Sequence, residues 1–236
     1  MYLGLADYLN ATHRPSICDI QWMSGTTMGH NLFPERIETR RLVFERLSHE
    51  TTDLFEFYEF VTRDDWQSAT AEHMPWFRFQ RLDQVTDFIE RAEQRWADRN
   101  AARYLLRSKE EEGELIGTTA FEPEWDTRRA SSDVALAKRY WGREYGVERA
   151  SVFVELTFER YDLDAYYTTC AASNDPSRRM IEKCVEKYGG RHEGLLRQHS
   201  LRPNGTVTDQ HRFTIVESEY EDATKGRETL EFDSDW

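Results

Sequence analysis

The stretch Asp133-Val-Ala-Leu-Ala-Lys-Arg-Tyr-Trp-Gly-Arg-Glu-Tyr-Gly-Val-Glu-Arg-Ala150 organises the rest of the chain. Its short apolar beginning predicts a buried strand, and Gly142 and Gly146 predict a tight turn where bare backbone approaches something closely. The apolar face of a helix follows, at steps of three and four residues: Val147, Ala150, Val154, Phe158 and Tyr161. A helix that begins after a glycine turn offers unpaired N–H groups to a phosphate, although an ordinary β–α turn would have the same spacing.

The order of residues 140–150 resembles the acetyl-CoA pyrophosphate loop of the GNAT N-acetyltransferases. Within that superfamily it looks like the RimJ/RimL type, which acetylates protein N-terminal amines. Glu144 stands where the family loop has its middle glycine, and a carboxylate there would repel phosphates unless it turns away or pairs with Arg143 or Arg139. The resemblance implies that the cofactor is bound by the following loop residues: Trp141, Gly142, Arg143, Glu144, Tyr145 and Gly146.

Upstream, residues 37–47 predict a strand with the sequence Thr39-Arg40-Arg41-Leu42, which resembles the threonine-x-arginine-leucine signature of the family. Two amphipathic helices follow from about Glu50 and Asp83. Strand patterns and turn residues predict further strands at 103–107, 115–121 (ended by Pro123), 130–137, 165–172, 191–197 and 206–216. The resemblance implies a GNAT fold of the α/β (α+β) class. Its mixed, mostly antiparallel sheet would have about seven strands, splayed between the fourth and the fifth, with flanking helices.

The resemblance also assigns roles around the splay. In this family the strand before the loop exposes backbone groups that pair with the pantetheine arm, and Leu136 is expected to make that contact. Downstream, residues 173–178 predict a capped helix start with a proline in the first turn. Their Asn-x-x-Ser spacing resembles the second cofactor motif, which implies that Asn174 and Arg178 contact the cofactor and that Ser177 protonates the departing thiolate. Helix capping alone is the alternative, and Asn174 could serve both purposes.

Acetyl transfer to an amine also needs the amine to lose a proton. An α-amine has a pKa near ~8 and a lysine side chain near ~10.4, so an α-amine needs far less help from a base. Many relatives have a glutamate early in the strand before the loop, where this chain has Ser131. Asp133 and Glu122 are therefore the candidate catalytic carboxylates, with surface charge as the alternative for both. A water chain to either carboxylate, or to Tyr140, could act instead.

Three aromatic residues are candidates for binding the acceptor. Trp76 and Phe77 lie in the proline-broken loop 72–77, which lines the acceptor side of the cleft in the family, and Tyr58 lies on the preceding helix. Packing in the core is the alternative for Trp76 and Phe77. Cys170 and Cys184 occupy apolar positions, so neither is expected to be a nucleophile, and direct attack in a ternary complex needs none.

The charge of the chain excludes some partners. With 44 acidic and 31 basic residues, the formal net charge is −13, which argues against nucleic acid as a partner. The acidic, lysine-poor composition is typical of proteins from high salt and predicts a halophile, with an ordinary acidic soluble protein as the alternative.

Cysteine and histidine spacing predicts neither a disulfide framework nor a metal site, so we expect no metal and a cytoplasmic location. No apolar run reaches the length of a membrane span, and the N-terminus lacks a signal pattern, so we expect no membrane partner.

Three regions follow from these patterns. Residues 1–32 are expected to be a flexible N-terminal extension, residues 33–217 a single catalytic domain, and residues 218–236 an acidic C-terminal tail. The domain is predicted to be an N-acetyltransferase with acetyl-CoA as co-substrate and a primary amine, first a protein N-terminus, as acceptor. A small amine, such as a polyamine or an aminoglycoside-like compound, is the alternative acceptor, and a CoA-binding sensor without turnover is the alternative function. A homodimer is compatible with the aromatic content and with the habit of the family.

Overall fold

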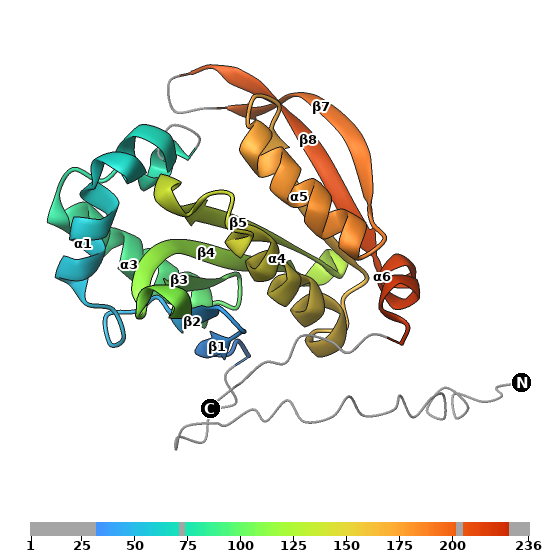
Figure 1. Cartoon of the computed structure of the whole chain (residues 1–236), viewed down its shortest axis with the longest axis horizontal. Coiled ribbons are helices and arrows are strands. Elements are labelled where there is room, and N and C mark those ends of the chain that lie inside the picture. The colour runs from blue at the N-terminus through green and yellow to red at the C-terminus, as the bar shows by residue number, and fades with distance from the viewer. Residues whose placement is uncertain (1–31, 71–73, 202–204, 227–236) are drawn as a thin grey trace, which may run out of the picture.

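The computed structural model describes residues 32–70, 74–201 and 205–226, and over these residues the chain builds one eight-stranded sheet (Figure 1). The strands are β1 (Arg36–Glu38), β2 (Leu42–Arg46), β3 (Ala102–Ser108), β4 (Glu114–Glu124), β5 (Arg129–Leu136), β6 (Ala165–Ala171), β7 (Arg191–Leu201) and β8 (Val207–Val216). Their spatial order is β1-β2-β3-β4-β5-β6-β8-β7, and β5–β6 is the one parallel pair in this sheet. The predicted mixed, mostly antiparallel fold is confirmed.

The predicted strand number is too low by one because the first predicted strand is a hairpin. The backbone turns at Thr39, whose N–H donates to the carbonyl of Leu42 at 2.9 Å. Ile37 then lies opposite Phe44, so β1 and β2 pair with each other instead of forming one long strand.

Helices cover both faces of the sheet: α1 (Leu54–Thr62), α3 (Leu82–Ala97), α4 (Tyr145–Glu155), α5 (Asp175–Lys187) and α6 (Glu217–Thr224). Neighbouring residues of β5 point to opposite faces. Ser132 accepts a hydrogen bond from Arg149 of α4, whereas Asp133 pairs with Arg103, whose guanidinium lies 5.3 Å from the ring of Phe88 on α3. The α4 helix, with α5 packed against it, therefore lies on the face opposite to α1 and α3 (Figure 1).

Aromatic packing between the sheet and α4 forms much of the core. Phe153 of α4 is fully buried, and its ring lies 5.8 Å from Phe44, 6.2 Å from Tyr104 and 5.5 Å from Phe121. Burying a side chain of this size stabilises the fold by about 2–3 kcal/mol. This core anchors α4 beneath β2 to β5 and so fixes the position of the loop that precedes the helix.

The sheet opens between β5 and β6. These strands pair only where Arg129–Ser131 lie beside Ala165–Tyr167, and they then diverge. The β7–β8 hairpin and α5 consequently lean away from the half of the sheet that contains β1 to β4 (Figure 1). The predicted splay between the fourth and fifth strands is confirmed, since these correspond to β5 and β6.

Two predicted ends differ from the structure. Pro123 does not end its strand, because β4 continues to Glu124. The pairing of β4 with β3 stops at Phe121, so no β3 residue stands opposite the proline and needs its missing N–H group. Part of the predicted acidic tail is helical: α6 begins at Glu217, and Tyr220 is 2% exposed and stacks on Phe158 at 4.6 Å. Residues 1–31 and 227–236 lie outside the described residues.

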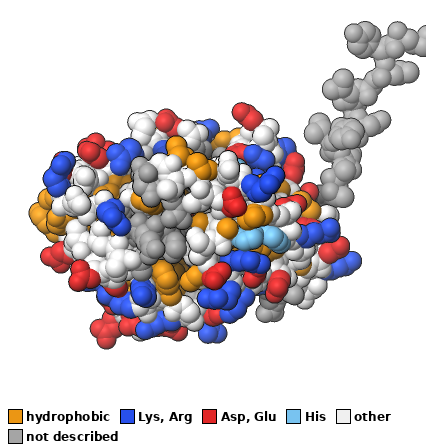
Figure 2. Space-filling model, turned by 90° about the horizontal axis from the view of Figure 1, so that it is seen from above, with side chains coloured by type: hydrophobic (Ala, Val, Ile, Leu, Met, Phe, Trp, Pro, Cys, Tyr) orange, Lys and Arg blue, Asp and Glu red, His pale blue; other side chains and the backbone are white. Residues whose placement is uncertain are grey.

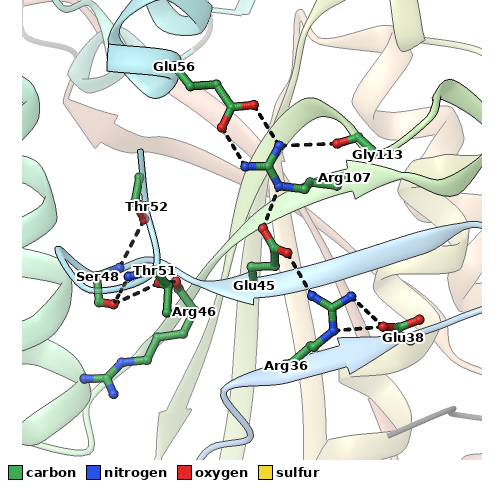
Figure 3. Close-up of polar contacts among 10 residues, drawn as sticks. All are labelled: Arg36, Glu38, Glu45, Arg46, Ser48, Thr51, Thr52, Glu56, Arg107 and Gly113. Carbon is green, nitrogen blue, oxygen red and sulfur yellow. Dashed lines mark hydrogen bonds and ion pairs between the residues drawn. The ribbon is translucent and has the colours of Figure 1, made fainter. Parts of the chain in front are cut away.

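Charged side chains of β1 to β3, together with Glu56 of α1, form an alternating chain (Figure 3). Arg107 donates to Glu56 at 2.6 and 2.8 Å and to Glu45 at 2.6 Å. Arg36 donates to the other oxygen of Glu45 at 2.8 Å and to Glu38 at 2.6 and 2.8 Å. Figure 2 likewise shows acidic and basic side chains interspersed over one face rather than separated by sign.

Candidate functional site

A cavity of about 680 Å³ lies in the wedge where β5 and β6 diverge, which is a volume typical of small-molecule sites. Residues 131–134 of β5 and 167–171 of β6 form its walls. The first turn of α5, the Trp141-Gly142 segment before α4, Trp76, and residues of β7 and β8 also contribute to the lining. Because the strands separate after Ser131, the inner edge of β5 beyond that residue has no strand neighbour and lies along the cavity.

Both candidate catalytic carboxylates line the cavity, and each already has an arginine partner. Asp133 accepts from Arg103 at 2.7 Å and from the N–H of Ala120 at 2.8 Å. Glu122 accepts from Arg95 at 2.9 Å. Neither Arg103 nor Arg95 is part of the cavity lining, so the two ion pairs bind these carboxylates from outside.

The first turn of α5 is built as predicted. Asn174 caps the helix, and its side-chain oxygen accepts from the N–H of Ser177 at 3.2 Å, with Pro176 in the first turn. Asn174 and Ser177 both line the cavity. The cap uses the backbone of Ser177 and leaves its hydroxyl available. Arg178 lies outside the lining and pairs with Glu182 at 2.8 Å.

Leu136 was expected to make a backbone contact with the pantetheine arm, and two side chains occupy its carbonyl. Thr70 Oγ1 donates to it at 2.7 Å and Trp141 Nε1 at 2.8 Å. A carbonyl oxygen has two lone pairs, so both are in use, and Leu136 does not itself line the cavity. The available edge of β5 is therefore nearer the vertex of the wedge, at residues 132–134.

The carboxylate of Glu144 is paired, and its partner is Lys183 of α5 at 2.5 Å rather than Arg143 or Arg139. Those two arginines pair with Glu111 and Glu114 of the β3–β4 hairpin. Glu144 has a φ of +65°, the left-handed region that favours the glycine of the family loop. The substitution thus costs backbone strain at this position, and Lys183 neutralises its charge.

The close backbone approach expected at Gly146 is made by a neighbouring helix. A Cβ added there would lie 2.9 Å from the Cγ of Met180 on α5, so the glycine allows α4 and α5 to pack. Tyr145 is 1% exposed and donates to Glu110 at 2.7 Å, so its side chain is part of the core. Gly142, by contrast, lines the cavity with a φ of +76° and open space around it.

The three candidate acceptor aromatics separate into two groups. Trp76 lines the cavity and is 58% exposed. Phe77 is fully buried and packs edge-on against Trp66 at 5.8 Å. Tyr58 donates to the carbonyl of Gln80 at 3.3 Å and lies outside the lining. Core packing therefore describes Phe77, and Tyr58 is a half-buried residue that packs against the core.

Arg149 of α4 lines the cavity and was missed by sequence reasoning. The residue is 3% exposed, and its Nη1 donates to Ser132 Oγ at 2.6 Å, while Ser132 also shares a short hydrogen bond with Tyr166. Within the described residues its Nε has no hydrogen-bond partner and its guanidinium no carboxylate. An arginine inside the apolar run that begins at Val147 was the signal in the sequence.

A second missed arginine lies on the opposite face of the wedge. The guanidinium of Arg212 on β8 lies 4.1 Å from the ring centre of Tyr167, and both residues line the cavity. Tyr167 donates a short hydrogen bond to Glu124, which also accepts from Arg129 at 2.6 Å. No spacing in the sequence connects β6 with β8 at this point, because the contact depends on strand register.

Residues of the threonine-x-arginine-leucine signature form hydrogen bonds with the helix that follows the loop. Glu148 of α4 accepts from Thr39 Oγ1 at 2.5 Å, from the N–H of Arg41 at 3.0 Å and from Arg41 Nε at 2.6 Å. Arg41 also donates to the carbonyl of Arg143 in the loop at 3.0 Å. The β1–β2 turn therefore holds the loop and the first turn of α4 in place.

Two findings limit the chemistry of the cavity. Burial raises the pKa of both Cys170 and Cys184 to about 11, so the two thiols stay protonated at neutral pH. Burial also raises the pKa of Tyr140, which makes this phenol a weaker base candidate.

Over residues 32–70, 74–201 and 205–226, no group of three potential ligands could hold a metal ion, and no helix has the length and apolarity of a membrane span.

The divided sheet, with its cavity between β5 and β6, defines the class of protein as one with a GNAT fold. Residues 41–184 match the family model described as an acetyltransferase (GNAT) domain, which is more than half of the chain. The chain therefore belongs to the GNAT acetyltransferase family, whose members use acetyl-CoA. A comparison of the sequence with curated proteins gave no match.

Solved structures of low sequence identity share this fold. The microcin C7 self-immunity acetyltransferase MccE, in complex with acetyl-CoA and AMP, is 16% identical over 79% of this chain and 98% of that chain, with a TM-score of 0.66. A Vibrio cholerae protein provisionally described as a ribosomal-protein-serine acetyltransferase is 21% identical over 77% and 97%, with a TM-score of 0.62. The Vibrio cholerae spermidine N-acetyltransferase, in complex with CoA and spermine, is 20% identical over 76% and 97%, with a TM-score of 0.58. At these identities the likeness establishes the fold alone.

Proposed function

We propose that this chain transfers an acetyl group from acetyl-CoA to a primary amine by direct attack in a ternary complex, with a protein N-terminal α-amine as first choice of acceptor. The observation that carries the proposal is the open inner edge of β5 at residues 132–134, which lies along a cavity reached from the α4 loop and from the first turn of α5. Extended ligands with amide groups bind strand edges of this kind through backbone hydrogen bonds.

The residues around the open edge of β5 are of the types that would bind acetyl-CoA. Gly142 leaves open space beside the cavity, and the N–H groups of Tyr145 and Gly146 begin α4 without a side-chain cap, as an anion-binding helix start requires. Glu144 adds no net repulsion while Lys183 is paired with it. Acetyl-CoA supplies an acetyl group activated as a thioester.

Arg149 is the strongest electrostatic feature of the cavity. Its guanidinium lies beside Ser132, the first β5 residue beyond the paired segment, and so near the vertex of the wedge. An N–H donor in a water-poor site stabilises negative charge that develops on an oxygen during acyl transfer. We assign this role to the guanidinium of Arg149, which lines the cavity and meets no carboxylate within the described part of the chain.

Ser177 is the residue proposed to give a proton to the departing sulfur. Ser177 lines the same cavity, and its hydroxyl is not used by the helix cap. No described carboxylate of the lining is without an arginine, so the acceptor has to lose its proton with little help. An α-amine, with a pKa near ~8, meets that requirement better than a lysine side chain near ~10.4.

Binding and turnover together test the proposal. Calorimetry with acetyl-CoA in molar potassium chloride, chosen for the predicted halophile, should give similar affinities for the wild type and for Glu144→Gly. Thiol release with an N-terminal peptide should then slow by about a hundredfold in Ser177→Ala, with CoA binding retained, because a proton donor is lost. Binding of acetyl-CoA without turnover of any amine would instead favour the CoA-sensor function.

The acceptor class is tested in the same assay. A polyamine or an aminoglycoside-like compound acetylated faster than any peptide would replace the protein N-terminus as first choice. The RimJ/RimL relationship, the homodimer and the cytoplasmic location stay predictions. Sedimentation of the purified chain tests the homodimer.

A further inference from the structure

The charged residues of the cavity contrast with the net charge of the chain. In a protein with a formal net charge of −13, the described lining contains three arginines and two carboxylates: Arg129, Arg149, Arg212, Glu122 and Asp133. Both carboxylates are neutralised by arginines from outside the lining. Arg129 is likewise paired, with Glu124 at 2.6 Å, so the excess positive charge that the cavity presents comes from Arg149 and Arg212.

Arg212 is held in place without using its charge. It stacks on Tyr167 at 4.1 Å, and Tyr167 is itself fixed by its hydrogen bond to Glu124 and by Arg129, whose guanidinium lies 5.2 Å from the ring centre. Among the described residues, Arg212 makes no ion pair and no side-chain hydrogen bond. Its planar fork is thus fixed in place and available, which is the arrangement that recognises carboxylates well.

The position of Arg212 relates this charge to the reacting end of the wedge. Tyr167 pairs with Ser131, the last β5 residue before the strands diverge, and Arg212 pairs with Thr169 on the other side of β6. β8 lies one strand spacing of about 4.8 Å from β6, and the guanidinium of Arg212 lies over Tyr167, toward the vertex of the wedge. A carboxylate on the acceptor would therefore meet Arg212 while the amine lies near the vertex.

A polycationic acceptor does not suit this lining. A second ammonium group would need a carboxylate without a partner, and Glu122 and Asp133 both have one. It would also meet Arg212 and Arg149 in a site of low dielectric constant, where like charges repel strongly.

We propose that Arg212 binds a carboxylate that the acceptor itself carries, so the acceptor is a primary amine with an acidic group beside the amine. Two sources share this chemistry: a peptide whose first residue is aspartate or glutamate, and a free α-amino acid. The inference rests on the proposed acetyltransferase function and names its substrate class.

Matched acceptors test the inference by thiol release. For the peptide source, we compare the rates with aspartyl-alaninamide and asparaginyl-alaninamide. For the free amino acid, we compare the rates with alanine and alaninamide. We expect at least about a tenfold higher kcat/KM for the carboxylate member of one pair, as for a hydrogen-bonded ion pair. Arg212→Gln should remove that preference and leave the KM for acetyl-CoA unchanged. Arg197→Gln, an exposed arginine of β7 outside the lining, is the matched control and should keep the preference.

Each other outcome overturns part of the account. Equal rates for both members of both pairs would leave the acetyltransferase function standing and overturn the carboxylate site. A raised KM for acetyl-CoA in Arg212→Gln would assign the arginine to the cofactor and overturn it too. If no amine is turned over, calorimetry of the CoA-loaded protein with aspartyl-alaninamide and, separately, with alanine decides. Binding of either that is lost in Arg212→Gln would support the site while the proposed function fails, and absence of binding of both would overturn both.

Discussion

Arg107 and Arg149 are both well-covered arginines, yet their surroundings are opposite. Arg107, on β3, makes ion pairs with Glu45 and Glu56 and belongs to the chain of alternating charges that also contains Arg36 (Figure 3). Arg149, on α4, meets a serine hydroxyl but no carboxylate of the described residues. A buried charge without a counter-charge is costly to the fold. The comparison therefore separates arginines that stabilise the structure from arginines whose charge is available to a ligand.

Replacing Arg149 should give the largest change. In Arg149→Met we expect kcat for thiol release to fall by about 10²–10³-fold, as when one preorganised donor of an acyl-transfer site is removed. The free energy of unfolding should stay the same or rise, because no carboxylate loses its partner and a desolvated charge disappears. Steady-state kinetics and urea unfolding of the same preparation measure both quantities.

Arg149→Lys is the control for charge, and it should recover part of kcat because a cation returns without the guanidinium geometry. A loss of about 3 kcal/mol in the free energy of unfolding of Arg149→Met, with kcat of the folded fraction unchanged, would show that Arg149 is structural.

Replacing Arg107 should have the reverse effect. Arg107→Met leaves Glu56 without its ion-pair partner and Glu45 with Arg36 alone. We expect the free energy of unfolding to fall by about 2 kcal/mol, less than for a fully buried pair because Glu56 is partly exposed. The value of kcat should stay within about twofold, since Arg107 does not line the cavity. A fall in kcat as large as that of Arg149→Met would remove the distinction between the two regions.

Glu148 gives a smaller and pH-dependent effect. Burial alone would raise its pKa, but hydrogen bonds from Thr39 and Arg41 outweigh burial, so the pKa is lowered in the folded protein. A carboxyl with a lowered folded pKa stabilises the fold above its unfolded pKa of about 4.3, and this contribution is lost as the pH falls through the folded value. Glu148→Gln should therefore lower the free energy of unfolding by about 1.5 kcal/mol at pH 7.

The difference between wild type and Glu148→Gln should shrink below about pH 4, where the wild-type carboxyl also becomes neutral. Urea unfolding from pH 3 to pH 8 measures it, with the exposed Glu50→Gln as a control that should show no such dependence. A difference that persists unchanged at pH 3 would mean that charge does not matter at this contact.

Sequence patterns predicted the parts of the molecule that depend on neighbours along the chain. The cap at Asn174 and the proline after it determine where α5 begins, and both are local signals. The splay of the sheet followed from a resemblance rather than from spacing, because divergence of β5 and β6 depends on packing over the whole sheet. The acidic composition of the C-terminal residues gave no sign of helix α6, because one buried tyrosine, Tyr220, anchors an otherwise polar helix.

Partners of charged residues could not be predicted from spacing. Glu144 lies one residue from Arg143 yet pairs with Lys183, because α4 and α5 pack closely at Gly146. Asp133 was expected as a catalytic carboxylate, and its pairing with Arg103 depends on the register of three strands. Such contacts arise only after the strands and helices are placed.

The smallest effect is expected for the two buried cysteines, which should take no part in catalysis. Cys170 lines the cavity and is 5% exposed, and burial raises its pKa to about 11. At pH 8 only about one thiol in a thousand would be a thiolate, so alkylation of Cys170 by iodoacetamide should be slow and should speed up about tenfold per pH unit. Peptide mapping by mass spectrometry distinguishes Cys170 from Cys184 in the native protein.

An acetyl-enzyme intermediate is tested by quenching a reaction that contains acetyl-CoA while it is in the steady state. We expect neither cysteine to be acetylated, because direct attack leaves no covalent intermediate. An acetylated Cys170 that disappears on adding acceptor would contradict direct attack and would shift the chemistry of the wedge from its unpaired arginines to its thiol.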